Sequence, residues 1–142
     1  GATKSPVVLG NIDAKRDWGH ARDYVRAMHA MMQLDTPEDF VISTEQTQTV
    51  RTFCELAARE MGFNLVWTGT GIDERGYDST TGQLLVSISS EFYRPAEVEL
   101  LLGDCTKAKN KLNWRPETSF EELVRDMCQH DLKLAQFEKD NP

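Results

Sequence analysis

Short apolar runs along the chain alternate with longer stretches that carry apolar residues at helical spacing. Four runs, Val7–Leu9, 39–44, 63–67 and 83–88, have the length and composition of strands. Val7–Leu9 is apolar throughout, which is typical of a strand that is covered on both faces. The pattern therefore predicts four strands, the first of them buried on both sides.

Between these runs, apolar residues recur every three or four positions, which predicts helices. One covers about 20–34, a second about 50–61 with Gly62 as its C-terminal cap, and a third about 104–112. A fourth begins at Ser119, which forms a capping-box pattern with Glu122 before a polar tail at 138–142. The buried face of the first helix is expected to hold Tyr24, Val25, Met28, Met31 and Met32. That of the second is expected to hold Val50, Phe53, Cys54, Ala57 and Met61, and that of the fourth Phe120, Leu123, Val124, Met127 and Leu134. This alternation of strands and helices indicates an α/β fold with at least some parallel pairing.

Residues 68–82 interrupt the pattern. They hold four glycines and little apolar surface apart from Ile72 and Tyr77, so that burial cannot offset the entropy of ordering them. We therefore expect a mobile loop. Two interpretations stay open: a lid that closes over a ligand with Arg75 on a phosphate, or a surface loop with no such role.

Composition limits the classes of function. The chain has 142 residues, 39% of them hydrophobic, which suffices for one domain or part of one. Its formal net charge of -7 argues against general binding to nucleic acid or to anionic membranes. Three cysteines without C-x-x-C spacing are typical of reduced thiols, and neither a membrane span nor a signal peptide is evident. We therefore expect a soluble cytoplasmic protein.

The common catalytic and metal-binding motifs are missing from the sequence. It has no G-x-G-x-x-G after a strand, no Walker loop and no G-x-S-x-G elbow. The three histidines do not have the spacing of metal ligands, and Asp73, Glu74 and Asp78 do not follow the calcium-binding pattern of an EF-hand. We therefore expect no metal site.

Two stretches carry cations where a ligand could use them. Arg16 follows a predicted strand and precedes a helix, the place where open α/β sheets bind ligands. Arg94 precedes Pro95, a residue suited to the first turn of a helix, and Glu97 follows three positions after Arg94. An arginine beside a helix N-terminus suits a diphosphate, and a carboxylate on that turn suits the hydroxyls of a ribose. Ordinary surface pairs, Arg94 with Glu97 and Arg16 with Asp13 or Asp17, explain the same residues equally well.

Four stretches resemble the C-terminal portion of the GDP-mannose 4,6-dehydratases, which belong to the extended short-chain dehydrogenase/reductase family. They are "LGNIDAKRDWGHARDYVRAM", "PEDFVIST", "FYRPAEVELLLGDCTKAKNKLNW" and "SFEELVRDM", and the resemblance covers about 7–132. It implies the C-terminal substrate-binding part of a Rossmann-like fold, with an incomplete parallel sheet and helices.

The resemblance also implies a site for GDP-mannose. Arg16 and Arg94 would hold the diphosphate, Glu97 the ribose, and Leu9, Gly10 and Asn11 would lie near the guanine. Trp18 would anchor the turn after Arg16 by packing. The activity that the resemblance implies is that of the family, whose members are NADP-dependent lyases. They convert GDP-mannose to GDP-4-keto-6-deoxymannose in the biosynthesis of GDP-fucose.

The parts of the family that bind NADP and catalyse the reaction lie upstream of this sequence. We therefore expect residues 1–142 to be the nucleotide-sugar-binding portion of the enzyme, with no catalytic residue and no activity alone. Its expected partners are the N-terminal part of the same enzyme and further copies in a homo-oligomer. The alternative hypothesis is a noncatalytic α/β module that binds a protein partner.

Overall fold

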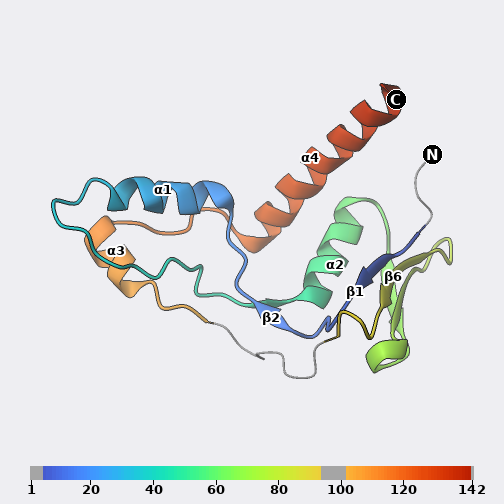
Figure 1. Cartoon of the computed structure of the whole chain (residues 1–142). Coiled ribbons are helices and arrows are strands. Elements are labelled where there is room, and N and C mark those ends of the chain that lie inside the picture. Colours follow the sequence, from blue (N-terminus) through green and yellow to red (C-terminus); the bar gives the residue numbers. More distant parts are fainter. Residues whose placement is uncertain (1–4, 94–101, 142) are drawn as a thin grey trace. The chain divides into compact units, whose positions relative to one another are not determined.

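The computed structural model describes residues 5–93 and 102–141, and the chain divides into two compact units (Figure 1). The sheet unit comprises Gly1–Ala14, Thr49–Val98 and Val124–Pro142. The helical unit comprises Lys15–Gln48 and Glu99–Leu123. Each unit is described by itself below.

The sheet unit is built on four strands in the order β1-β6-β5-β4. β1 runs parallel to β6 with Val8 opposite Ser87, whereas β5 is antiparallel to both β6 and β4. The predicted α/β class with some parallel pairing is confirmed. The elements of this unit are β1 (Val7–Leu9), α2 (Val50–Glu60), β4 (Leu65–Thr68), the 3-10 turn η1 (Gly71–Asp73), β5 (Arg75–Asp78), β6 (Leu84–Ile88) and most of α4 (Phe120–Asp140).

Helix α2 has the ends that the sequence predicted. The Thr49 hydroxyl accepts a hydrogen bond from the Thr52 amide at 3.1 Å and caps the N-terminus. Gly62 follows the last turn with φ +85°, and the Phe63 amide then donates to the Ala58 carbonyl at 2.8 Å. This is a Schellman motif, in which glycine avoids the strain that a Cβ would bring.

The prediction of a loop at 68–82 is wrong, because these residues contain η1 and the whole of β5. β5 is an inner strand that pairs with β4 and β6, so its backbone groups have partners on both sides. Gly76 eases the packing there, since a Cβ would lie 2.8 Å from Leu65 Cδ1 and 3.0 Å from Trp67 Cζ3, and these side chains would have to shift. The glycine that indicated a loop therefore admits close packing within a sheet. The lid hypothesis depended on this loop and is rejected together with it. The Arg75 guanidinium donates to the carbonyls of Ile72 and Glu74.

We expect the amide protons of β5 to exchange slowly in the absence of any ligand, because the strand lies inside the sheet. Hydrogen exchange followed by mass spectrometry or NMR measures this, with the turn at Thr80 and Gly82 as the fast-exchanging comparison. Exchange of residues 75–78 as fast as that of the turn would contradict the assignment of an inner strand.

The first strand is less covered than the sequence predicted. Val7 is 60% exposed and Val8 is 46% exposed, whereas Val86 and Ile88 on the neighbouring β6 are buried. β1 is one of the two edge strands of the sheet, and its apolar side chains lack cover among the described residues.

The helical unit has its own core. Ala27, Cys105, Ala108 and Trp114 are buried together, and partly buried apolar side chains surround them. Asp23 is buried beside this core, with only 2% of its surface exposed. The elements of the unit are β2 (Lys15–Arg16), α1 (Ala21–Met31), β3 (Gln48–Thr49, at the boundary of the unit), α3 (Thr106–Leu112) and the first turn of α4.

Residues 39–44 do not form the predicted strand. The segment has no ladder partner among the described residues, although Phe40 and Ile42 pack on the core of the helical unit. The Ser43 hydroxyl donates to the Gly103 carbonyl at 2.9 Å, and the Thr44 amide donates to Asp17. An apolar run indicates burial, but only a neighbouring strand would make it part of a sheet.

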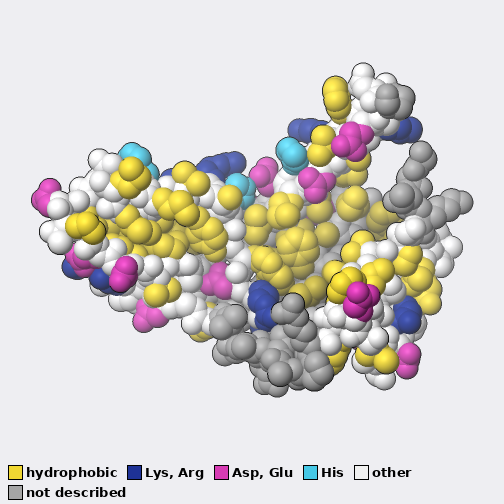
Figure 2. All heavy atoms as spheres, in the orientation of Figure 1, with side chains coloured by type: hydrophobic (Ala, Val, Ile, Leu, Met, Phe, Trp, Pro, Cys, Tyr) yellow, Lys and Arg dark blue, Asp and Glu magenta, His cyan; other side chains and the backbone are white. Residues whose placement is uncertain are grey.

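The buried face of α1 also differs from the prediction. Asp23 and Ala27 are its buried residues, while Val25, Met28 and Met32 are between 59% and 81% exposed. Only Tyr24 and Met31 of the predicted stripe pack on the core. On the face shown in Figure 2, hydrophobic side chains gather along α1.

Helix α4 begins as predicted. The Ser119 amide donates to Glu122 Oε2 at 2.8 Å and the Glu122 amide donates to Ser119 Oγ at 3.2 Å, which confirms the capping box. Phe120, Leu123 and Val124 of the predicted face are buried, but Met127 and Leu134 are nearly half exposed. The helix continues to Asp140 through most of the predicted polar tail. Within 5–93 and 102–141, no helix has the length and apolar character needed to cross a membrane.

Candidate functional site

The segment predicted to face guanine lies at the end of β1, in the sheet unit. The Leu9 carbonyl accepts a hydrogen bond from the Ser89 amide at 2.8 Å, continuing the parallel pairing with β6. The side chain of Asn11 accepts from the Asp13 amide at 3.0 Å, which turns the chain away from the strand. Leu9, Gly10 and Asn11 therefore form a defined turn at the carboxyl end of a parallel strand, where open α/β sheets bind ligands.

Gly10 allows the chain around Phe92 to approach this turn closely. A Cβ at position 10 would lie 2.2 Å from the Phe92 carbonyl oxygen, which no real contact permits. Phe92 precedes Arg94 by two residues in the sequence. The turn after β1 and the stretch leading to the second predicted cation are thus packed against each other.

We expect Gly10→Ala to lower the free energy of unfolding by about 1–3 kcal/mol, since the backbone at Phe92 must move to admit the methyl group. Urea unfolding measures the loss. The comparison variant is Asn11→Ala, which deletes one exposed hydrogen bond and should cost about 1 kcal/mol or less. A Gly10→Ala protein as stable as the wild type would contradict the close approach.

Beyond Asn11, the chain is attached to the first turn of α2. The Arg51 amide donates to the Ile12 carbonyl at 2.8 Å and the Val50 amide donates to the Ala14 carbonyl at 3.2 Å. The side chains of Ile12 and Ala14 are buried. Two of the free amides that begin α2 are therefore used to hold the segment that follows the predicted guanine contact.

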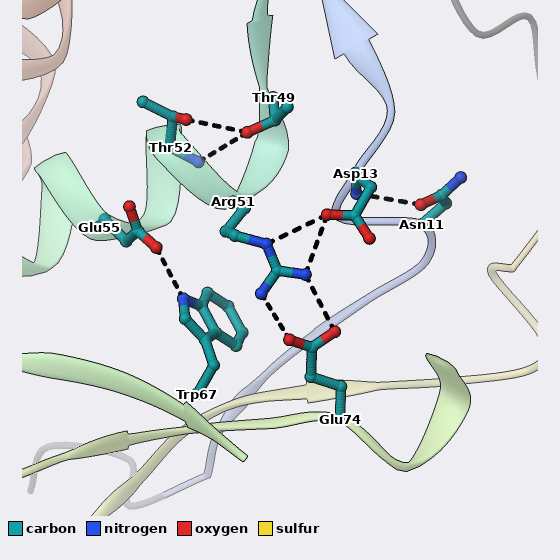
Figure 3. Close-up of polar contacts among 8 residues, drawn as sticks. All are labelled: Asn11, Asp13, Thr49, Arg51, Thr52, Glu55, Trp67 and Glu74. Carbon is teal, nitrogen blue, oxygen red and sulfur yellow. Dashed lines mark hydrogen bonds and ion pairs between the residues drawn. The ribbon is translucent and has the colours of Figure 1, made fainter. Parts of the chain in front are cut away.

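The Arg51 side chain lies at the centre of a cluster of charged groups (Figure 3). Its guanidinium donates twice to Glu74, at 2.5 and 3.0 Å, and twice to Asp13 Oδ1, at 2.9 and 3.1 Å. It also lies 5.0 Å from the centre of the Trp67 ring. The hydrogen bonds to Glu74 hold the pKa of Arg51 above its ordinary value, so the charge is permanent. Sequence patterns missed this cluster, because its partners come from separate segments.

Arg16, the first predicted phosphate ligand, lies in the helical unit on β2, which pairs with β3. Its guanidinium donates to the Lys15 carbonyl at 2.7 Å. Asp13, one of the two carboxylates proposed to pair with it, forms an ion pair with Arg51. Asp17, the other, accepts from the Thr44 hydroxyl at 2.6 Å and from the amides of residues 44 and 45.

The turn around Asp17 is held by a second set of polar contacts within the helical unit. Glu45 has a left-handed backbone with φ 59°, and its carboxylate accepts from the Cys105 amide at 3.2 Å and pairs with Lys109. The hydrogen bond from Lys109 holds the pKa of Glu45 below its ordinary value. Asp17, the residue next to Arg16, therefore bonds to a turn whose Glu45 is itself held by Cys105 and Lys109.

Trp18 anchors this region as the sequence predicted. Its ring stacks on Phe120, with centroids 5.7 Å apart and planes 25° from parallel. Beside the pair lies a hollow of about 230 Å³ with a mixed polar and apolar lining. The other residues lining it are Thr44, Gln46, Gln48 and residues 116–119.

Two of the predicted site residues, Arg94 and Glu97, lie outside the described residues. Their roles as diphosphate and ribose ligands remain predictions, as do the alternative surface pairs. Of the six predicted ligands, Leu9, Gly10 and Asn11 lie together in the sheet unit, and Arg16 lies in the helical unit.

The cysteines are not activated for nucleophilic chemistry. Burial, followed by the nearby Glu55 carboxylate, raises the pKa of Cys54 to about 11. Burial likewise raises the pKa of the Cys105 and Cys128 thiols. All three are therefore protonated at neutral pH. Among the described residues, no group of three or more His, Cys, Asp or Glu side chains could hold a metal ion.

Solved structures share the fold. RMD from Pseudomonas aeruginosa, complexed with NADPH, aligns with a TM-score of 0.64 and 18% identity over 87% of this chain and 35% of its own. The UDP-glucose 4-epimerase of Thermotoga maritima, with UDP-glucose, aligns with a TM-score of 0.67 and 24% identity over 93% of this chain and 36% of its own. These likenesses confirm the predicted fold, a part of the Rossmann-like extended short-chain dehydrogenase/reductase fold.

Sequence comparison is more specific. The GDP-mannose 4,6 dehydratase of Homo sapiens is 52% identical over 126 residues, which are 89% of this chain and 34% of the human protein. The chain spans about a third of the length of the curated relatives it matches. The family model described as GDP-mannose 4,6 dehydratase matches residues 1–127. This chain therefore belongs to the GDP-mannose 4,6-dehydratase family.

Proposed function

We propose that this chain is the nucleotide-sugar-binding portion of a GDP-mannose 4,6-dehydratase, a lyase that converts GDP-mannose to GDP-4-keto-6-deoxymannose. The observation that carries the proposal is the family match over residues 1–127, with 52% identity to the human enzyme. Because the chain spans only about a third of such relatives, the complete reaction is proposed for the whole enzyme and not for this part alone.

The binding roles follow from the chemistry of the ligand. The turn at Leu9, Gly10 and Asn11 receives the guanine, where backbone groups and the Asn11 amide can contact the base edge. Arg16 and Arg94 bind the diphosphate, since a guanidinium donates two parallel hydrogen bonds to phosphate oxygens. Glu97 accepts hydrogen bonds from the ribose hydroxyls. The location of the turn at the carboxyl end of β1 supports this assignment.

NADP is proposed to bind the complete enzyme outside this chain. A dinucleotide needs a glycine-rich turn between a strand and a helix N-terminus. Gly69 follows β4 and Gly71 begins the short turn η1, after which comes the strand β5 and not a helix, so these residues do not fit the cofactor. No catalytic step is assigned to the described residues, and we propose that the chain is inactive alone.

The location and assembly of the enzyme are proposed from its free thiols and its exposed apolar side chains. The three cysteines are free thiols, as in proteins of a reducing compartment, which supports a cytoplasmic location. Exposed Val7 and Val8 on β1 would suit cover by the N-terminal part of the enzyme, and we propose a homo-oligomer as its assembly. The alternative hypothesis of a module that binds a protein partner gains no support from the family match.

Titration calorimetry of the full-length enzyme with GDP and GDP-mannose tests the proposal. We expect both ligands to bind one site in competition, and we expect the enzyme with NADP to release one water per GDP-mannose consumed. UDP-glucose serves as the comparison ligand. A full-length protein that binds neither GDP nor GDP-mannose would overturn the proposed function.

A further inference from the structure

The proposed guanine turn ends in a segment that is held from one side by α2. Residues 11–14 leave β1, and their backbone reaches α2 through the carbonyls of Ile12 and Ala14. Asp13 sits in the middle of this segment, and 68% of its side chain is exposed. Packing therefore does not fix the Asp13 side chain, whose position depends on its polar partners.

Arg51 is the partner that joins this segment to the sheet. Four hydrogen bonds use its Nε and both terminal nitrogens, two to Asp13 and two to Glu74 (Figure 3). Glu74 comes directly before β5 and its side chain is only 10% exposed. The guanidinium also faces the Trp67 ring of β4 at 5.0 Å, and the Trp67 indole donates to Glu55 at 2.9 Å.

These contacts differ in what they stabilise. The pair with Glu74 neutralises a carboxylate that is largely out of water, so it contributes to folding. The pair with Asp13 is at the surface, where an isolated ion pair contributes little to stability. Its geometry nevertheless fixes residue 13, because one guanidinium held rigidly by Glu74 and Trp67 binds a single carboxylate oxygen twice.

We infer that Arg51, acting through Asp13, is a positioning residue that holds the base-binding turn at Gly10 and Asn11 in shape and thereby sets the preference for guanine. The inference rests on the proposed function. The side chain of Arg51 is not assigned a contact with the ligand. It acts by fixing the segment that follows the base contact, much as supporting hydrogen bonds orient the ligands of other binding sites.

The test compares base preference in the full-length enzyme. Competition against a fluorescent GDP derivative gives the Kd of GDP and of UDP for the wild type, Arg51→Gln and Asp13→Ala. We expect both variants to raise the Kd of GDP roughly tenfold, since displacing binding groups by about 1 Å can cost up to ~100-fold. The Kd of UDP should change less than about twofold, because the diphosphate ligands remain in place.

Glu55→Ala is the matched control. It removes the acceptor of the Trp67 indole in the same cluster but no contact to residues 11–14, so both Kd values should stay as in the wild type. Arg51→Lys keeps the charge but cannot make the four-bond fork, and it should give an intermediate GDP preference. If Arg51→Gln does not fold, Asp13→Ala decides, because the Asp13 side chain is exposed and its removal leaves the Arg51–Glu74 pair intact.

The outcomes separate the two proposals. A wild-type enzyme that prefers GDP, with variants that keep this preference or lose GDP and UDP affinity equally, overturns the positioning role and leaves the proposed function standing. A wild-type enzyme that does not bind GDP overturns the proposed function, and the inference with it.

Discussion

Replacing Asp23 by alanine is expected to lower the free energy of unfolding by about 3–5 kcal/mol, the usual cost of breaking a buried charged network. The carboxylate accepts from the amides of Glu117 and Thr118, both at 3.0 Å, and from Arg26 at 3.0 Å. Asp23 is 2% exposed, so alanine would leave the two amides without their acceptor. Arg26 is 38% exposed and would keep its contacts with the Arg115 carbonyl and with Glu117. The Asp23 carbonyl accepts from the Trp114 indole at 2.7 Å, and the variant would keep that bond.

Urea unfolding measures the effect, with Asp35→Ala as the control at an exposed aspartate. The control should change stability by about 0.5 kcal/mol or less, as exposed substitutions usually do. Asp23→Asn should fall between the two, because an amide keeps one oxygen acceptor but loses the charge opposite Arg26. An Asp23→Ala protein within 1 kcal/mol of the wild type would contradict the structural role of this carboxylate.

The dependence of this stability on pH gives an independent check. Burial raises the pKa of Asp23, but hydrogen bonds from the Thr118 and Glu117 amides, with the charge of Arg26, bring it below its ordinary value. A carboxyl with a lowered pKa in the folded state stabilises fully above its unfolded pKa and loses this stabilisation as pH falls through the folded pKa. Acidification below about pH 4 should therefore destabilise the wild type more steeply than Asp23→Asn.

Arg94→Ala is expected to weaken the binding of GDP to the full-length enzyme by about 2–4 kcal/mol, the range for losing one side of a buried charge-assisted contact. The expectation comes from the Arg-Pro-x-Glu spacing and the family membership, since Arg94 lies outside the described residues. Arg94→Lys should also bind weakly, because an ammonium cannot reproduce the two-point contact with phosphate.

Titration calorimetry with GDP measures this loss. Arg59→Ala is the control, an exposed arginine in the last turn of α2, and it should leave the affinity unchanged. Equal affinity of wild type and Arg94→Ala would refute the diphosphate role of Arg94 and favour the surface pair with Glu97. Full affinity of Arg94→Lys would argue for a simple point charge in place of a guanidinium fork.

Local patterns in the sequence predicted most of the elements and their ends. The capping box at Ser119 and Glu122 and the glycine after α2 involve groups within four or five residues of one another, so they operate in any fold that keeps the helix. The strands β1, β4 and β6 were likewise indicated by short apolar runs. The family resemblance, later confirmed by comparison, supplied the candidate ligands that local chemistry left open.

Burial was predicted less well than secondary structure. The stripe of α1 included Val25, Met28 and Met32, yet the residues that face the core are Asp23 and Ala27. An aspartate on a buried face contradicts the hydrophobic pattern unless its partners are known, and these lie more than ninety positions away, at Glu117 and Thr118. Hydropathy along one helix contains no information about such partners.

The sequence by itself determined the α/β class, the helix caps, the family and the residues proposed to bind the nucleotide, because each depends on neighbours along the chain or on a pattern shared with relatives. Only the tertiary structure decided that residues 75–78 form an inner strand, that residues 39–44 do not form one, and that Arg51 joins Asp13 to Glu74. The physical reason is the same in each case. A strand exists only where another backbone offers its hydrogen-bonding edge, and a buried charge is placed only where partners from distant segments meet it.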